Sequence, residues 1–319
     1  MDVVKHMNFS DNVEIKTYGE LKNKSRKTAI VLSGGGATGS YQAGFLKAAL
    51  EYNFKPEIVI GCSVGALNAL GFIQDDMEFL EHLWTTINIE SLIGRSNKKI
   101  DKSEYFNKEF WRYFRKWLFL KNSNNQKLYE QGKRIGLIPK GLEDIVYNNI
   151  DEEKIRKSNI EFIVHLTQVH QLGEGFTGWR PITLTKDEIS VGLLADYVLG
   201  SSCFMPLFKA KKIGKGHFID GGITNNNPWE KAIALGADEI INVNTGGKFL
   251  NTSRIIKTNR SKAKLLKTLD NVRFFTVRPP ENIVLGAMDF FPELTKKMMI
   301  AGYETGLRFF EEYQKLSNL

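Results

Sequence analysis

Residues 27–39 read KTAIVLSGGGATG and residues 58–70 read IVIGCSVGALNAL. In each stretch a short apolar run, typical of a buried strand, leads into a glycine-rich turn. Apolar residues at helical spacing follow each turn, so each stretch predicts a strand, a tight turn and a helix. Two such units in succession predict an α/β fold, in which strands form a mostly parallel sheet and helices cover both of its faces.

Further apolar runs extend this pattern along the chain. They lie at residues 161–168, 181–184, 217–219, 239–243 and 273–277. We therefore expect a three-layer α/β/α arrangement around one central sheet. We assign the domain to residues 28–310, with a polar leader at residues 1–27 and a short tail at residues 311–319.

Residues 94–141 interrupt the pattern and are rich in lysine, asparagine and aromatic residues, and we expect them to form an inserted helical cap. Within this region, residues 105–120 (YFNKEFWRYFRKWLFL) place aromatic side chains on one helical face and basic side chains largely elsewhere. Such a helix suits peripheral contact with a membrane or the covering of an acyl-binding pocket, and packing on the core is the alternative. A second basic stretch, residues 248–267, is expected to form an exposed loop and a helix.

The cysteines, the apolar runs and the net charge of the chain indicate which compartment and which kind of partner to expect. The chain has 319 residues, a net charge of +8 and two cysteines, Cys62 and Cys203. The cysteines form no CxxC pair, so neither a disulfide framework nor a zinc site is expected, and the reducing cytoplasm fits best. The sequence shows no apolar run long enough for a transmembrane helix and no secretory signal at its start, and we expect neither. The positive charge favours an anionic partner, either nucleic acid or a phospholipid surface.

The first glycine run has two interpretations. Residues 34–39 (GGGATG) satisfy the GxGxxG pattern after a strand and before a helix, as in dinucleotide-binding domains. Such domains also need an acidic residue about twenty positions further on, where it binds the ribose hydroxyls. Here the second strand ends at Ile60 and runs into residues 61–63 (GCS), which contain no carboxylate. The sequence therefore disfavours a nucleotide cofactor.

The second glycine motif, residues 61–65 (GCSVG), is a GxSxG elbow, in which the serine stands on a sharp turn between strand and helix. A serine that attacks an ester needs backbone N–H donors aimed at the oxygen that becomes negative. The amides of Gly34, Gly35 and Gly36, at a helix N-terminus, can supply such donors. The two motifs together therefore predict acyl transfer with Ser63 as the nucleophile.

A serine nucleophile needs a base, and two candidates are present. The order Ser63, Asp196, His217 allows a triad of the α/β-hydrolase type. Asp220 is favoured, because it follows a short apolar strand and precedes two glycines, which suits a carboxylate aimed into a site. An aspartate base needs a water-poor pocket that raises its pKa and a short hydrogen bond to the serine. Cys62 is rejected as the nucleophile, because the elbow exposes its central residue.

Three motifs resemble those of the patatin-like phospholipase family in order and spacing. They are GGGATGSYQAG at residues 34–44, GCSVGALNA at residues 61–69 and DGGITNNNP at residues 220–228. The resemblance extends over residues 28–310 and implies a patatin-like fold.

This resemblance also implies a mechanism without a catalytic histidine, metal or organic cofactor. Ser63 would be the nucleophile, Asp220 the base, and the amides of Gly34, Gly35 and Gly36 the oxyanion hole. The substrate would be a lipid or phospholipid ester, and no nucleic acid partner is expected.

Thr38 departs from the family pattern, since Arg or Lys is common at this place in the glycine motif. The missing cation bears on rate and on head-group preference, and a catalytically weak lipid-binding or regulatory protein is the alternative function.

Overall fold

The computed structural model describes residues 12–21, 26–93, 138–172, 175–205, 207–245, 253–283 and 285–317. The expected helix at residues 105–120 and most of the expected cap at residues 94–141 lie outside this part of the chain.

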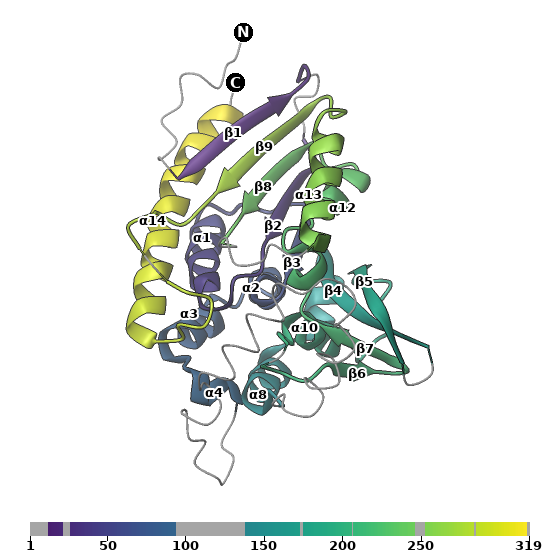
Figure 1. Ribbon diagram of the computed structural model, residues 1–319. Coiled ribbons are helices and arrows are strands. Elements are labelled where there is room, and N and C mark those ends of the chain that lie inside the picture. Colours follow the sequence, from purple (N-terminus) through teal and green to yellow (C-terminus); the bar gives the residue numbers. More distant parts are fainter. Residues whose placement is uncertain are drawn as a thin grey trace.

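One nine-stranded sheet forms the centre of the molecule (Figure 1). Its strands are β1 (Val13–Tyr18), β2 (Thr28–Leu32), β3 (Ile58–Cys62), β4 (Glu161–Leu172), β5 (Gly175–Thr185), β6 (Lys211–Ile213), β7 (Gly216–Ile219), β8 (Glu239–Val243) and β9 (Val272–Val277). The order is β1-β9-β8-β2-β3-β4-β7-β6, and β5 pairs with β4 outside this path. Neighbours from β9 through β8, β2 and β3 to β4 are parallel, and the remaining pairs are antiparallel. The predicted mostly parallel sheet is confirmed.

Helices cover both faces of the sheet. They are η2 (Gly36–Gly39), α1 (Ser40–Glu51), α2 (Val64–Ile73), α3 (Met77–Thr86), α4 (Ile89–Ile93), α8 (Lys140–Asn149), α9 (Glu152–Lys157), α10 (Leu194–Ser202), α11 (Gly222–Asn225), α12 (Glu230–Ala234), α13 (Ser253–Leu266) and α14 (Pro292–Ser317). In Figure 1, α1 and α14 lie to one side of the sheet and α12 and α13 to the other. None of the helices in the described residues is long and apolar enough to cross a bilayer.

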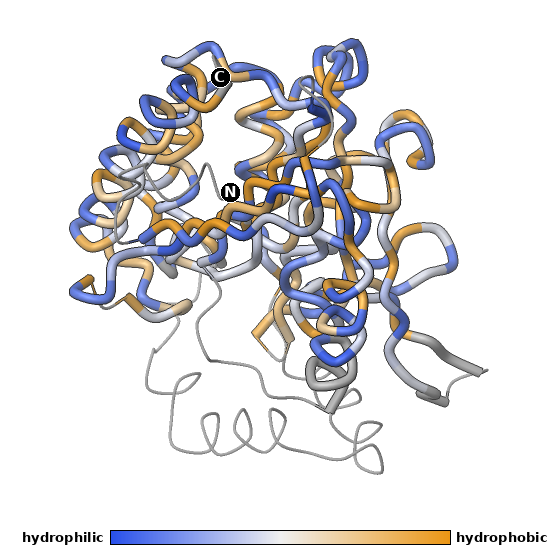
Figure 2. Tube along the Cα trace, turned by 90° about the horizontal axis from the view of Figure 1, so that it is seen from above, coloured by the Kyte–Doolittle hydropathy of each residue, from blue (hydrophilic) through white to orange (hydrophobic). Residues whose placement is uncertain are grey.

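Alternate residues of the buried strands divide between two cores, because side chains along a strand point to opposite faces. Ile30 and Leu32 of β2 pack with α1, α2 and α14, whereas Ala29 and Val31 pack with Trp229 and α12. Figure 2 shows the hydrophobic strands at the centre, and the outer helices alternate between hydrophobic and hydrophilic residues. This double burial explains why the strands are continuous apolar runs in the sequence.

Both ends of the expected domain extend further than the sequence pattern suggested. β1 lies within the segment that we expected to be a polar leader, and it pairs with β9 at the edge of the sheet. Its Val13 and Ile15 are partly buried against the larger core, whereas Glu14 and Lys16 form an ion pair of 2.5 Å. α14 continues to Ser317, so most of the expected tail is helical.

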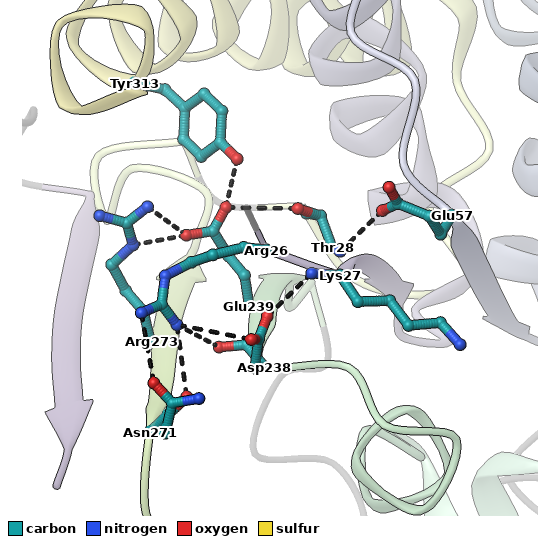
Figure 3. Close-up of polar contacts among 9 residues, drawn as sticks. All are labelled: Arg26, Lys27, Thr28, Glu57, Asp238, Glu239, Asn271, Arg273 and Tyr313. Carbon is teal, nitrogen blue, oxygen red and sulfur yellow. Dashed lines mark hydrogen bonds and ion pairs between the residues drawn. The ribbon is translucent and has the colours of Figure 1, made fainter. Parts of the chain in front are cut away.

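A buried ionic cluster lies where the parallel strands begin (Figure 3). Glu239, fully buried at the start of β8, accepts a hydrogen bond of 2.5 Å from Arg273 Nε and another from the hydroxyl of Tyr313. Thr28 at the start of β2 lies 3.3 Å from the same carboxylate. The cluster joins β2, β8, β9 and the last turns of α14 at the end of the sheet opposite to the glycine motifs.

Candidate active site

Two strands meet end to end along one edge of β4. Ile163 and His165 of β4 pair with β3 on one edge and with β5 on the other. Residues 167–169, further along β4, also pair with β5. Their other edge, which is the edge on which β3 pairs with the first half of β4, pairs with β7. Because β3 is parallel to β4 and β7 is antiparallel, the two strands run toward each other. Ser63 follows β3 and Asp220 follows β7, so these two residues face each other.

Ser63 occupies a sharp turn between β3 and α2. Its φ is 53°, a left-handed conformation that residues other than glycine seldom adopt. The N–H of Ser63 donates to Ser201 Oγ at 2.8 Å, and Ser201 Oγ donates to the carbonyl of His165 at 2.6 Å. A Cβ added to Gly65 would lie 2.4 Å from the carbonyl oxygen of Leu32, so glycine permits this close approach of helix to strand.

The carboxylate of Asp220 accepts hydrogen bonds on both of its oxygens. Ser63 Oγ donates to Oδ2 at 2.6 Å, and the N–H of Gly222 donates to Oδ1 at 2.7 Å. Only 5% of Asp220 is exposed, and burial raises its pKa from 3.8 to about 6, although both hydrogen bonds lower it. A carboxylate with this pKa is ionised at neutral pH and is a stronger base than an ordinary aspartate.

The glycine loop lies beside Ser63, and its three glycines differ in what their N–H groups do. Gly34 donates its N–H to the carbonyl of Asn226 at 3.3 Å and accepts from Asn226 Nδ2 at 2.9 Å. Within the described residues, the N–H groups of Gly35 and Gly36 have no protein acceptor. Gly36 has a φ of +57°, and a Cβ there would lie 2.0 Å from the carbonyl oxygen of Ala287. Glycine is therefore required at this position.

A chain of buried amide side chains holds both ends of the glycine loop. Trp84 Nε1 donates to Asn68 Oδ1 at 2.8 Å, and Asn68 Nδ2 donates to the carbonyl of Gly39 at 2.8 Å and to Gln42 Oε1 at 3.1 Å. Gln42 Nε2 in turn donates to the carbonyl of Ser33 at 2.7 Å. Asn68 and Gln42 belong to the glycine motifs quoted above, but no pattern in the sequence links the two side chains.

Thr38 also stabilises the glycine loop, through hydrogen bonds of its hydroxyl group. Its hydroxyl lies 2.8 Å from the carbonyl oxygen of Gly35 and 3.2 Å from that of Thr245, two residues after the end of β8. The residue is 8% exposed. Threonine thus stabilises the loop with hydrogen bonds to its backbone.

The alternative triad would need the hydroxyl of Ser63 to donate to His217, but this hydroxyl donates to Asp220. Asp196 accepts a hydrogen bond of 2.5 Å from the hydroxyl of Tyr147 and pairs with Lys211 at 3.3 Å. His217 lies in β7 opposite Val169.

Two other reactive groups near the site are held neutral. The thiol of Cys62 is buried, lies 3.7 Å from the carbonyl oxygen of Asn225 and has a pKa raised well above its usual value by burial. Burial lowers the pKa of His165 to about 3, and its ring nitrogens contact the hydroxyls of Thr183 at 2.8 Å and Thr224 at 3.3 Å. A neutral buried thiol is a poor nucleophile, which supports the rejection of Cys62.

A cavity of about 970 Å³ contains Ser63, Asp220 and the three glycines in its wall. The rest of the wall divides by the face of the sheet. On the α1 face the lining is apolar and continuous with the larger core, and includes Leu67, Trp84, Leu92, Leu142, Phe208 and Met298. On the α13 face it is mixed: the polar residues Asn225, Asn226, Asn227, Asn259 and Lys262 lie there together with Trp229, Ala263 and Leu266. The shape and lining suit a long apolar group that carries a polar end.

Comparisons with known proteins agree with this architecture. The model of the patatin-like phospholipase family matches residues 30–233, more than half of the chain. VipD from Legionella pneumophila is 16% identical with a TM-score of 0.50, and the alignment covers 94% of this chain and 70% of VipD. Human GIVD cytosolic phospholipase A2 is 9% identical with a TM-score of 0.52, over 92% of this chain and 60% of that one. At these identities the likeness shows the fold. Among curated proteins, none matches the chain.

Proposed function

Since the chain belongs to the patatin-like phospholipase family, we propose that it is a serine acyl-hydrolase that cleaves carboxylic esters of lipids or phospholipids. The observation that carries this proposal is the hydrogen bond of 2.6 Å from Ser63 Oγ to Asp220 Oδ2 inside a largely apolar cavity. A nucleophile and a base within this distance form the minimal machinery for acyl transfer.

The reaction proceeds in two steps through an acyl-enzyme. Ser63 Oγ attacks the ester carbonyl carbon while its proton passes to Asp220. The bond to the alcohol then breaks, and Asp220 returns the proton to the leaving alkoxide. A water molecule next gives a proton to Asp220 and attacks the acyl group on Ser63. The bond from the acyl carbon to Ser63 Oγ breaks, the fatty acid leaves, and Asp220 returns its proton to Ser63 Oγ, which restores the serine hydroxyl.

We assign the oxyanion hole to the glycine loop. Among the described residues, the N–H groups of Gly35 and Gly36 have no protein acceptor, which supports them as donors, and the amide of Val64, in the first turn of α2 beside the nucleophile, would be a further donor. Gly34 contributes mainly by its missing side chain, because a Cβ there would lie 2.9 Å from Ser63 Cβ. Its own N–H becomes a donor to substrate only if it leaves Asn226.

Peripheral contact with a membrane belongs to the same proposal. Its support is the amphipathic pattern of residues 105–120, together with an apolar cavity wall suited to a lipid chain. The thiols of Cys62 and Cys203, both free and buried, suit a reducing compartment such as the cytoplasm.

Fatty acid release from a mixed lipid extract tests this function. Mass spectrometry should detect free fatty acids with the wild type, and Ser63→Ala and Asp220→Asn should each reduce their release by about a thousandfold or more. Both variants should keep the wild-type circular dichroism spectrum. Lipid binding without Ser63-dependent release would instead support the lipid-binding alternative.

A further inference from the structure

The side chain of Asn226 contacts all three glycine motifs of the proposed site. Its Nδ2 donates to the carbonyl of Gly34 at 2.9 Å, and its Oδ1 lies 4.0 Å from Cys62 Sγ. A Cβ added to Gly222 would lie 2.8 Å from the same Oδ1. Asn226 therefore sits where the glycine loop, the nucleophile turn and the segment after Asp220 converge.

The backbone of Asn226 also bonds to Gly34, because the carbonyl of Asn226 accepts a hydrogen bond from the N–H of Gly34 at 3.3 Å. Gly34 also lies next to Ser63, because a Cβ added to Gly34 would be 2.9 Å from Ser63 Cβ. The place of Asn226 thus fixes how far the loop stands from the nucleophile.

Lys262 of α13 holds the residues on either side of Asn226. Its Nζ donates to Asn225 Oδ1 at 2.8 Å and to the carbonyl of Asn227, and it pairs with Glu230 Oε2 at 3.4 Å. Only 9% of Lys262 is exposed. The ammonium group therefore ties the turn at residues 225–227 to a helix that covers the far face of the sheet.

Lys262 lines the cavity, so a direct role as a cation for an anionic head group is the competing interpretation. An ammonium group has three N–H donors. Here two of them bond to Asn225 Oδ1 and to the carbonyl of Asn227, and the carboxylate of Glu230, 3.4 Å from Nζ, offsets the charge. The contacts thus favour a role within the protein over one toward a ligand.

We propose that Lys262 is a positioning residue for the hydrolase reaction. By holding the turn at residues 225–227, it keeps Asn226 hydrogen-bonded to Gly34, and this contact determines the distance between the glycine loop and Ser63. This inference rests on the function proposed above. Its consequence is that Lys262 and Asn226 act as one unit.

A double-mutant cycle on hydrolysis of a short p-nitrophenyl ester tests this coupling. Lys262→Met and Asn226→Ala should each lower kcat by about tenfold or more while KM changes by less than about twofold, because the loss lies in transition-state geometry. The double variant should be no slower than the slower single variant. Lys262→Arg, which keeps charge and donors, should lose less than Lys262→Met. Lys264→Met, at an exposed position of the same helix, is the matched control and should keep the wild-type kcat.

Two results would overturn the proposal: a wild-type kcat in Lys262→Met, or effects of Lys262→Met and Asn226→Ala that multiply in the double variant. A larger change in KM than in kcat would also overturn it. If Lys262→Met does not fold, Lys262→Gln, which is polar but uncharged, takes its place in the cycle and is read by the same criteria. Hydrolysis by the wild type that survives Ser63→Ala would instead refute the proposed function itself.

Discussion

At the scale of single residues, the proposed chemistry depends on the backbone conformation of Ser63 and on the burial of Asp220. Ser63 is held in a left-handed conformation by the turn around it, which costs free energy that the surrounding hydrogen bonds must offset. Asp220 is buried, and burial raises its pKa to about 6. The same apolar surroundings that make the carboxylate a better base also exclude water from the reacting ester.

The pKa of Asp220 predicts how activity depends on pH. The base must be ionised, so kcat/KM for a neutral ester should rise as pH increases through about 6 and then level off. His165 has a pKa of about 3 and stays neutral over this range, so it does not produce this rise. A profile measured from pH 4.5 to 8.5, with stability checked at each pH, provides the test. A flat profile would contradict the proposed base.

The sequence pointed to the two residues to which we assign the chemistry. Ser63 and Asp220 follow short apolar strands and stand next to glycines, and the folded chain brings their side chains within 2.6 Å. The roles of Asn226, Gln42 and Thr38 could not be predicted from the sequence, because each acts through hydrogen bonds to backbone groups that only the folded chain brings near. Asn226, for example, bonds to Gly34, which is 192 residues away.

At the scale of elements, the tight contact of α1 with α14 stabilises the face that carries the apolar cavity wall. A Cβ added to Gly44 would lie 1.9 Å from the carbonyl oxygen of Met299, and one added to Gly302 would lie 2.0 Å from that of Tyr41. The two helices therefore meet backbone to backbone at these glycines. Phe45 and Phe309 beside them are in ring contact, with centroids 5.3 Å apart.

Gly44→Val should force the two helices apart. We expect the free energy of unfolding to fall by about 2–3 kcal/mol or more, because overpacking displaces both backbones. Urea denaturation followed by circular dichroism measures the change. Ile300→Ala, at a position of α14 that is 48% exposed, serves as the control and should change stability by about 0.5 kcal/mol or less. Equal effects of the two substitutions would contradict the close contact.

The continuous apolar strands and the helices α1 and α2 were predictable from the sequence because their periodicity is strong. β1 and β6 were missed for physical reasons. β1 is a half-exposed edge strand inside a polar segment, and β6 has only three residues, Lys211–Ile213. The end-to-end meeting of β3 and β7 on β4 was also out of reach, because it depends on the order of strands in space.

At the scale of the whole molecule, the two ends of the sheet have different roles, one in the proposed catalysis and the other in stability. Its carboxyl ends carry the proposed site, in keeping with the usual place of ligands in open parallel sheets. Its amino ends carry the ionic cluster of Glu239, Arg273 and Tyr313 (Figure 3). The cluster fastens the last turns of α14 to the strands, so it should support stability without contacting the substrate.

Arg273→Leu should separate these functions experimentally. The substitution leaves the fully buried carboxylate of Glu239 without its cation, which typically costs about 3–5 kcal/mol. The urea midpoint should therefore fall, whereas kcat measured where the variant is folded should stay near the wild-type value. Lys315→Ala, which removes an exposed ion pair, is the control and should cost about 1 kcal/mol or less. Loss of kcat in folded Arg273→Leu would contradict the separation.

The most direct test of the central claim is covalent labelling with a fluorophosphonate, followed by mass spectrometric mapping of the modified residue. The account predicts one adduct per chain, on Ser63, formed at a rate that falls by about a thousandfold in Asp220→Asn because the serine loses its base. An adduct on another residue, or labelling of Ser63 at an unchanged rate in Asp220→Asn, would contradict it.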